Sequence, residues 1–211
     1  NKFSYHERFI KNSNQEINKA LKDVNGIIVP IGWGERGVDG MVEAINYARV
    51  NKIPYLGLCL GMQLAVVEFA RNKAGLKNAH TTEVNPKTKH PVIHIIPEQI
   101  RNLKSRAYGG TMRPGSWDCK VKKNTLAHSC YKTTDISERH RHRYEFNQDY
   151  LQELESKGLI ISGKSKKENL VEIIELSQKE HPFFIGTQGH PEYKSRPLKP
   201  HPIFLRFIKA S

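Results

Sequence analysis

Two short apolar stretches decide the fold: Gly26-Ile-Ile-Val-Pro-Ile31 and Ile53-Pro-Tyr-Leu-Gly-Leu58. Such short runs without polar alternation are typical of strands that are buried on both faces of a parallel sheet. A helical pattern follows each run, over 38–50 and over 60–73. Strand, helix, strand and helix with short connections predict parallel strands joined by right-handed crossovers.

The rest of the chain extends this core in both directions. Upstream, the spacing of Ile10, Ile17 and Leu21 predicts an amphipathic helix over 5–24. Downstream, helices are expected at 148–157 and 202–210. Further strands are expected at 91–96, 117–121, 138–146, 159–163, 170–176 and 183–188. We therefore expect an α/β fold in which helices flank a mostly parallel central sheet that carries a smaller antiparallel extension.

The size and composition bound the class of protein. The 211 residues correspond to a single domain over 1–211, and the chain begins at Asn1 without an opening strand and helix, so we expect a fragment. No apolar run approaches the ~20 residues of a membrane span. Three cysteines give no disulfide framework, which favours a reducing, cytoplasmic compartment.

The formal charge of +13 raises the question of a nucleic-acid partner. The basic residues are spread along the chain, and the dense cluster Arg139-His-Arg-His-Arg143 has no interleaved aromatic residues on which bases would stack. On a strand the three arginines would share one face and the two histidines the other. No cysteine or carboxylate at ligand spacing joins the histidines, so we expect neither nucleic-acid nor metal binding there.

A glycine pattern, Gly32-Trp-Gly-Glu-Arg-Gly37, follows the first strand and satisfies the dinucleotide fingerprint. That fingerprint requires a carboxylate about twenty residues later, at the end of the next strand, to bind a ribose. The residues there are Ile53–Cys59 and include no acid. A glycine-rich turn, or a loop that offers a backbone N–H to a reaction centre, is the better interpretation.

The second strand leads into Gly57-Leu-Cys-Leu-Gly61, a nucleophile-elbow pattern with cysteine in place of serine. The flanking glycines let strand and helix approach closely, and the turn lifts Cys59 above the carboxyl end of the sheet. The helix dipole is expected to lower the pKa of the thiol. The alternative is a small buried residue at a strand end.

A candidate base lies far downstream, where the strand at 183–188 ends in Gly189-His-Pro-Glu192. A histidine at the carboxyl end of a strand, with a carboxylate two residues later, can act as a base and its orienting group. Cys59, His190 and Glu192 together therefore predict nucleophilic catalysis.

At this point the residues resemble a known family. Pro54-Tyr-Leu-Gly-Leu-Cys-Leu-Gly-Met-Gln63 together with Gly189-His-Pro-Glu192 is similar to the class I (triad) glutamine amidotransferases. Further stretches resemble the glutaminase domain of CTP synthases: Arg36-Gly-Val-Asp-Gly40, Asn78-Ala-His-Thr-Thr-Glu83, Gly109-Gly-Thr-Met-Arg-Pro-Gly115 and Glu138-Arg-His-Arg-His-Arg-Tyr-Glu145. Ser195-Arg-Pro-Leu-Lys-Pro200 resembles the eukaryotic branch.

The resemblance implies a role for each matching residue. Cys59 would be the nucleophile, His190 the general base and acid, and Glu192 the group that orients His190. The residues expected to contact glutamine are Gly32, Leu60, Gln63, Glu83 and Arg143, with Gly32 and Leu60 also supplying oxyanion donors. Glu83 suits the α-ammonium group of the substrate and Arg143 its α-carboxylate.

The resemblance also implies partners. Ammonia from L-glutamine would serve the ATP-dependent conversion of UTP to CTP in a synthase domain of the same polypeptide, which forms a homo-tetramer. ATP and Mg²⁺ are expected only in that absent domain, with no cofactor, metal, membrane or nucleic acid here. Another triad amidotransferase or a γ-glutamyl hydrolase is one alternative.

The chain departs from the family pattern at three positions. Ile31 replaces the first of two glycines, Trp33 replaces a phenylalanine, and Gly189 replaces an aromatic residue before His190. Ile31 is expected to reshape the oxyanion loop and Gly189 to loosen His190. These two departures favour the remaining alternative, a catalytically silent regulatory module.

Overall fold

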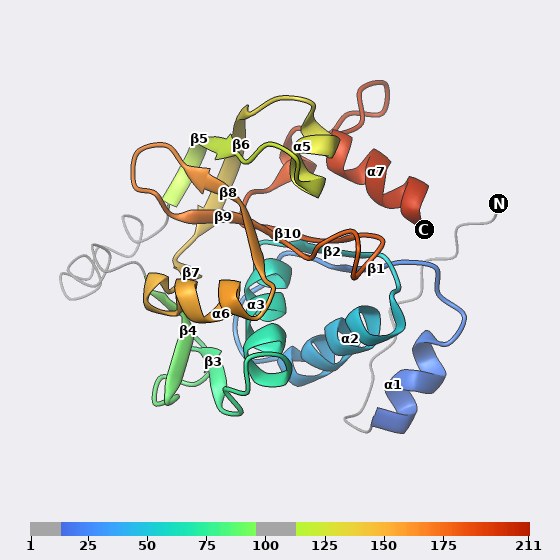
Figure 1. The fold of residues 1–211 in the computed structure, drawn as a ribbon, viewed down its shortest axis with the longest axis vertical. Coiled ribbons are helices and arrows are strands. Elements are labelled where there is room, and N and C mark those ends of the chain that lie inside the picture. The colour runs from blue at the N-terminus through green and yellow to red at the C-terminus, as the bar shows by residue number, and fades with distance from the viewer. Residues whose placement is uncertain (1–13, 96–112) are drawn as a thin grey trace.

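The computed structural model describes residues 14–95 and 113–211 (Figure 1). The helices are α1 (Asn14–Leu21), α2 (Val38–Asn51), α3 (Leu60–Asn72), α5 (Leu126–Tyr131), η2 (Gln148–Tyr150), α6 (Leu151–Ser156), η3 (Pro191–Tyr193) and α7 (Pro202–Ala210). The strands are β1 (Ile27–Val29), β2 (Tyr55–Leu58), β3 (Ala79–Thr81), β4 (His90–Ile95), β5 (Arg113–Val121), β6 (Asp135–His142), β7 (Tyr144–Phe146), β8 (Ile160–Ser165), β9 (Val171–Glu175) and β10 (Phe184–Thr187).

Seven strands form the main sheet in the order β1-β2-β10-β9-β8-β5-β6. The strands β1, β2 and β10 run parallel to one another, whereas every other neighbouring pair is antiparallel. The α/β fold with flanking helices is confirmed. Among the described residues, however, the sheet is mixed rather than mostly parallel, because the antiparallel strands continue the same sheet.

The second sheet is smaller and contains β3, β4 and β7. It corrects the strand expected over 138–146, which the structure divides at Arg143. Strand β6 ends at His142 in the main sheet, and β7 begins at Tyr144 in the small sheet, where it pairs with β4. Arg143 therefore lies at the point where the chain passes from one sheet to the other.

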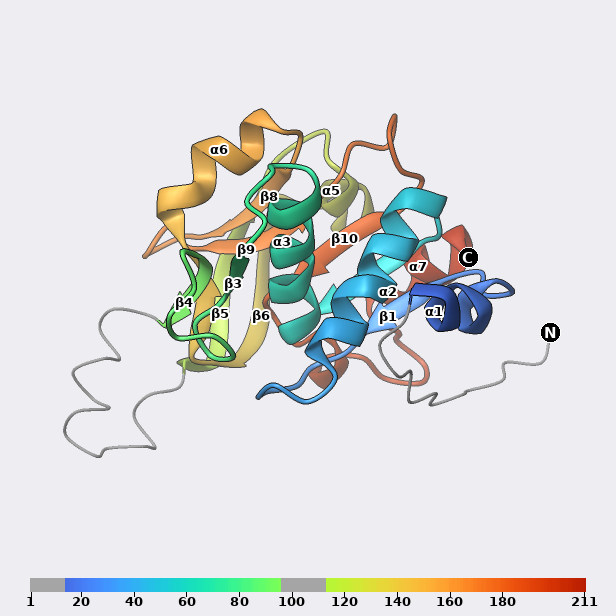
Figure 2. The same cartoon turned by 90° about the horizontal axis from the view of Figure 1, so that it is seen from below.

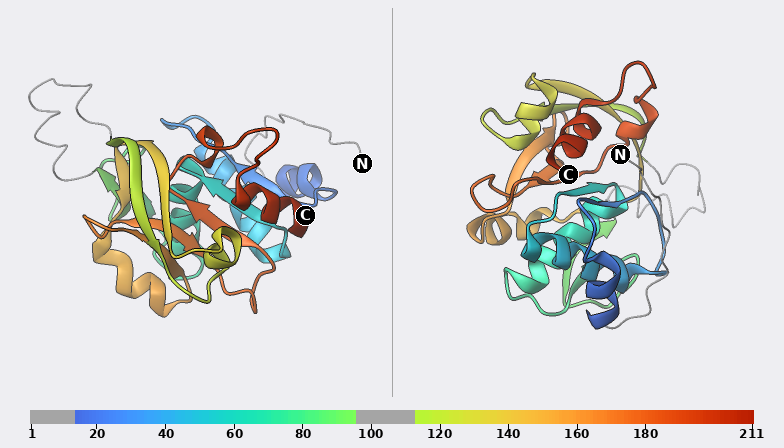
Figure 3. Two further views of the ribbon diagram at one scale, coloured as in Figure 1. Left: turned by 90° about the horizontal axis from the view of Figure 1, so that it is seen from above. Right: turned by 90° about the vertical axis from the view of Figure 1, so that its right-hand side faces the viewer.

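Helices cover both faces of the main sheet, with α2 and α3 on one face and α5 and α7 on the other (Figures 1 and 2). The apolar strands supply side chains to both layers. Phe184 belongs to the hydrophobic cluster around α3, whereas its neighbour Ile185 belongs to the cluster around α7. This is why the strands at the centre of the sheet lack polar alternation. Figure 3 shows the two layers from two further directions.

Most of the expected elements are confirmed, with ends that differ by a few residues. The structure adds α5 and β3, for which no element was expected. Much of the expected helix over 5–24 and the stretch 109–112 lie outside the described residues. Within the described part of the chain, no helix has the length and apolar character needed to cross a membrane.

Candidate active site

Cys59 occupies a strained turn between β2 and α3. Its φ of 49° and ψ of −98° lie outside the regions that ordinary residues prefer. The turn is close-packed, because a Cβ added at Gly57 would lie 2.7 Å from the carbonyl carbon of Gly61. The Cys59 N–H donates to Thr187 O at 2.8 Å, which ties the turn to the end of β10. The nucleophile-elbow geometry predicted from the glycine spacing is present.

His190 lies beside this turn and pairs with Glu192. Its Nδ1 donates to Glu192 Oε1 at 2.6 Å. Its backbone N–H donates to Arg139 O at 2.7 Å, and its ring stacks on Tyr193 at 5.1 Å between centroids. Nε2 is buried and makes no hydrogen bond within the described residues. His190 is therefore held by a side-chain bond, a backbone bond and a stacked ring in this structure.

A cavity of about 290 Å³ joins these residues to the expected substrate-binding groups. Its lining residues are Ile31, Gly32, Trp33, Cys59, Gln63, Glu83, Arg141, His142, Arg143, Tyr144, His190 and Tyr193. Leu60 is buried beside the cavity, and its backbone N–H donates to the sulfur of Cys59. Tertiary structure thus gathers residues that are up to 162 positions apart in the sequence, from Ile31 to Tyr193.

The charged side chains that line this cavity are Glu83, Arg141 and Arg143, and the two expected to bind substrate, Glu83 and Arg143, have opposite sign. Glu83 follows β3, and its Oε1 accepts a hydrogen bond of 3.1 Å from the Gly34 N–H. It therefore also supports the loop that contains Gly32. Arg143 lies between β6 and β7, and its Nε is buried without a hydrogen-bond partner among the described residues. A ligand with separate cationic and anionic groups matches this pair.

Gln63 and Gln188 connect the elbow to the wall of the cavity. Gln63 Nε2 donates to Tyr144 O at 2.9 Å and to Gln188 Oε1 at 3.1 Å. Gln188 Nε2 in turn lies 3.5 Å from Cys59 Sγ. Both amide hydrogens of Gln63 are therefore committed to protein acceptors. Its role here is to hold the cavity wall, and only its oxygen remains to receive a hydrogen bond from a ligand.

Burial raises the pKa of the Cys59 thiol to about 12, although hydrogen bonds from Leu60 and Gln188 act in the opposite direction. The nearby carboxylates Glu192 and Glu83 add to the increase. The lowered pKa expected from the helix dipole is therefore wrong for this structure, because the loss of hydration at a 5% exposed side chain outweighs the dipole. Burial therefore favours the thiol over the thiolate in this structure.

Two residues near Cys59 and His190 escaped sequence reasoning. Gln188, next to the Cys59 sulfur, is the last residue before Gly189-His190. Because β10 runs parallel to β2, a residue at the carboxyl end of β10 is expected to lie near the carboxyl end of β2, where Cys59 follows. The sequence could therefore have indicated Gln188. Tyr193, which stacks on His190, gave no such signal because its position depends on the turn of η3.

The residues described include one group with the spacing of a metal site. His140, His142 and Glu172 offer ligand atoms that all lie within 4.8 Å of one another. This corrects the reasoning that no carboxylate joins the two histidines: Glu172 comes from β9, thirty residues downstream of His142. Burial lowers the pKa of His140 to about 2 and that of His142 to about 3. All three cysteines are buried and free.

The fold and the cavity together define an α/β protein with a strained cysteine and a buried histidine, paired with a half-buried carboxylate, at the carboxyl end of parallel strands. This is the arrangement that nucleophilic catalysis by a thiol requires. The family model for glutamine amidotransferase class-I matches residues 4–210. The chain belongs to the class I glutamine amidotransferase family.

Similar proteins narrow the family further. The chain is 58% identical over 200 residues to the CTP synthase of Caldanaerobacter subterraneus and 56% identical over 202 residues to that of Sulfolobus acidocaldarius. These matches cover 95% and 96% of this chain but only 36% and 37% of the relatives. The solved glutaminase domain of Trypanosoma brucei CTP synthase, with bound acivicin, aligns with a TM-score of 0.85 at 38% identity and covers 93% of this chain and 74% of that domain.

This chain therefore corresponds to the glutamine amidotransferase domain of the CTP synthases. It spans about a third of the length of these curated relatives. The eukaryotic resemblance of 195–200 gains no support from the identities, which are higher for the bacterial and archaeal relatives than for the trypanosomal domain.

Proposed function

We propose that this chain hydrolyses the side-chain amide of L-glutamine to glutamate and ammonia through a γ-glutamyl thioester on Cys59. One observation carries the proposal: the strained Cys59 and the paired His190 line the same cavity as Glu83 and Arg143. A free amino acid with a reactive side-chain amide needs all of these groups at once.

In the first half-reaction, Cys59 gives its proton to Nε2 of His190 as sulfur attacks the amide carbon. Because burial keeps the thiol protonated, transfer of the proton has to accompany the attack. Glu192 holds Nδ1 of His190 and stabilises the imidazolium that forms. The imidazolium then protonates the leaving nitrogen, so ammonia departs and the thioester remains.

The second half-reaction releases glutamate. His190 takes a proton from water, the resulting hydroxide attacks the thioester carbon, and the proton returns to the departing sulfur. In both half-reactions negative charge develops on the amide or thioester oxygen. The backbone N–H of Leu60 and a donor near Gly32 are the proposed partners of that oxygen, and loss of one donor would slow the reaction on the order of a hundredfold.

The backbone of glutamine is held by charge. Glu83 receives the α-ammonium group and Arg143 the α-carboxylate. Gln63 can contact the substrate only through its side-chain oxygen, because both of its amide hydrogens are donated to Tyr144 O and Gln188 Oε1.

The test of the proposal is to incubate the purified chain with L-glutamine and to measure glutamate. Wild-type chain should form glutamate, and Cys59→Ala should form none. Acivicin, the ligand of the trypanosomal domain, should label Cys59 and should not label the alanine variant, as peptide mass spectrometry would show. Glutamate formation that survives Cys59→Ala would overturn the assignment.

We further propose that the ammonia serves a synthase domain that converts UTP to CTP with ATP and Mg²⁺, in a cytoplasmic homo-tetramer. The names and greater length of the relatives support the synthase-domain part of this proposal. In a polypeptide that contains both domains, Cys59→Ala should abolish CTP formation from glutamine and preserve CTP formation from free ammonia. Equal loss of both would contradict it.

A further inference from the structure

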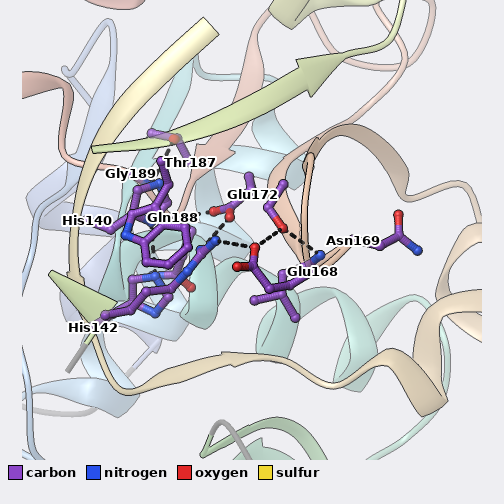
Figure 4. Close-up of polar contacts among 12 residues, drawn as sticks. His140, His142, Glu168, Asn169, Glu172, Thr187, Gln188 and Gly189 are labelled. Atoms are coloured by element: carbon purple, nitrogen blue, oxygen red, sulfur yellow. Dashed lines mark hydrogen bonds and ion pairs between the residues drawn. The ribbon is translucent and has the colours of Figure 1, made fainter. Parts of the chain in front are cut away.

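Behind the cavity wall lies a buried chain of polar side chains that the proposed chemistry does not use (Figure 4). Arg113 Nη1 donates to Glu172 Oε1 at 2.5 Å, and Glu172 Oε2 lies 3.5 Å from His140 Nδ1. His140 Nδ1 lies 3.0 Å from His142 Nε2, and His142 Nδ1 lies 2.9 Å from Tyr144 O. In Figure 4 the two imidazoles lie on one side of Glu172 and Glu168 on the other.

The direction of these hydrogen bonds follows from the last acceptor. A carbonyl oxygen only accepts, so His142 Nδ1 must carry a hydrogen and donate it to Tyr144 O. Burial keeps His142 neutral, so its Nε2 has a lone pair and accepts from His140 Nδ1. His140 is neutral for the same reason. Both imidazoles therefore have one defined tautomer, and the donors point toward Tyr144.

This assignment argues against a metal ion between His140, His142 and Glu172. In the tautomer assigned above, His140 Nδ1 carries the hydrogen that it donates to His142, so a metal ion there would require the other tautomer and would break this bond. The carboxylate already bears a cation, since Arg113 contacts its other oxygen. A metal ion would place two cations against one buried carboxylate. The spacing is that of a metal site, but the hydrogen bonding is that of a fixed scaffold.

The chain of hydrogen bonds ends on the two residues that flank Arg143. His142 closes β6 and Tyr144 opens β7, so the bond from His142 to Tyr144 O spans Arg143 and fixes the turn between the two sheets. Gln63 donates to the same carbonyl from α3. Arg143 Nε has no hydrogen-bond partner among the described residues, and the turn fixed by His142 carries this side chain to the cavity.

We propose that the buried hydrogen bonds from His140 to His142 and from His142 to Tyr144 O are a positioning device that holds Arg143 against the α-carboxylate of the substrate. The proposal rests on the proposed glutaminase function, of which it names one determinant of substrate affinity. His142 is a positioning residue that acts through Arg143. Arg113 in β5 forms an ion pair with Glu172, whose other oxygen lies 3.5 Å from His140 Nδ1 without a hydrogen bond.

The test measures the dissociation constant of L-glutamine by calorimetry in the Cys59→Ala background, where binding is separated from turnover. His142→Leu should weaken binding at least about tenfold, because the turn that carries Arg143 loses its side-chain bond. His142→Asn, whose amide can donate from the place of Nδ1, should recover most of this loss. Arg143→Ala should weaken binding at least as much as His142→Leu.

The double variant distinguishes positioning from a general structural effect. If His142 acts through Arg143, adding His142→Leu to Arg143→Ala should change the dissociation constant by less than about twofold. His181→Leu is the matched control, because His181 is also buried and lies 3.0 Å from a backbone carbonyl, that of Ala48, away from the cavity. It should lower the melting temperature to a similar degree and leave glutamine binding unchanged.

Independent losses in the double variant, or no effect of His142→Leu, would overturn the proposal. Stoichiometric zinc in the purified wild-type chain, lost with His142→Leu, would overturn it in favour of a metal site. Failure of the Cys59→Ala chain to bind glutamine would also overturn it. If that chain binds glutamine as expected but wild-type chain forms no glutamate, only the proposed hydrolysis fails.

Discussion

At Gly189 a single added methyl group should affect both the stability of the fold and the activity of the neighbouring His190. In Gly189→Ala the new Cβ would lie 2.8 Å from Glu138 Cβ and 3.4 Å from Thr187 Oγ1. Carbon atoms in contact normally lie ~3.5–4.0 Å apart, so the segment that contains Gly189 must move away from strand β6. Glu138 cannot easily yield, because it is paired in β6 and its Oε1 accepts a hydrogen bond of 2.7 Å from His201.

The expected magnitude follows from this overlap. Overpacking of a well-packed interior costs about 1–3 kcal/mol. For a chain of this size, each kcal/mol lowers the melting temperature by roughly 2–4 °C, so a decrease of about 2–12 °C is expected. Activity should fall further, because His190 follows directly and its N–H is bonded to Arg139 O. A shift of about 1 Å at a catalytic group can reduce the rate about a hundredfold.

The assay combines thermal unfolding with the rate of glutamate formation at saturating glutamine. Gly32→Ala is the stability control, because its Cβ would also lie 2.8 Å from a neighbour, but that neighbour is the flexible end of the Leu60 side chain. Its melting temperature should fall by less than half as much. If Gly189→Ala melts within about 1 °C of the wild type and retains its turnover, the argument that Gly189 is tightly packed against Glu138 is refuted.

Three further predictions concern buried ionisable groups. Arg49→Met removes the partner of the fully buried Glu68 and should lower the free energy of unfolding in urea by about 3–5 kcal/mol, with much of the loss recovered in the double variant with Glu68→Gln. Iodoacetamide should alkylate Cys59 at a rate that still rises above pH 9, because burial holds its pKa at about 12, and a plateau below pH 8 would contradict this. In the folded chain the pKa values of His140 and His142 are about 2 and 3, so below about pH 6.5 only the unfolded chain binds protons at these residues. Each histidine therefore lowers the free energy of unfolding by about 1.4 kcal/mol for every pH unit of acidification. His142→Asn should reduce that slope by the contribution of one histidine in urea titrations between pH 7 and pH 5, and an unchanged slope would contradict the prediction.

Local sequence was a reliable guide wherever the signal was local. The apolar runs of β1 and β2 and the glycines around Cys59 predicted the elbow, since strand burial and a tight turn depend on a few adjacent residues. The opposite held for 138–146, where uniform alternation gave no sign of the break at Arg143. That break depends on β4, which pairs with β7 and draws the chain into a second sheet.

The pKa of Cys59 shows the same division. A cysteine at the start of a helix suggests a lowered pKa, because the dipole is a local property of the helix. The burial of the sulfur, the charge of Glu192 and the hydrogen bond from Gln188 all depend on residues from the far end of the chain. Burial is a sum over such distant contacts, so its sign and size could not be inferred from the elbow alone.

The sequence by itself determined the α/β class, the elbow, and the order of cysteine, histidine and carboxylate, because each depends on patterns of a few neighbouring residues. Only tertiary structure decided that the sheet is mixed, that Glu172 meets two histidines from another strand, and that Arg143 lies at a junction of sheets. The physical reason is that strand pairing and burial join residues distant in sequence, and their energies depend on which surfaces meet.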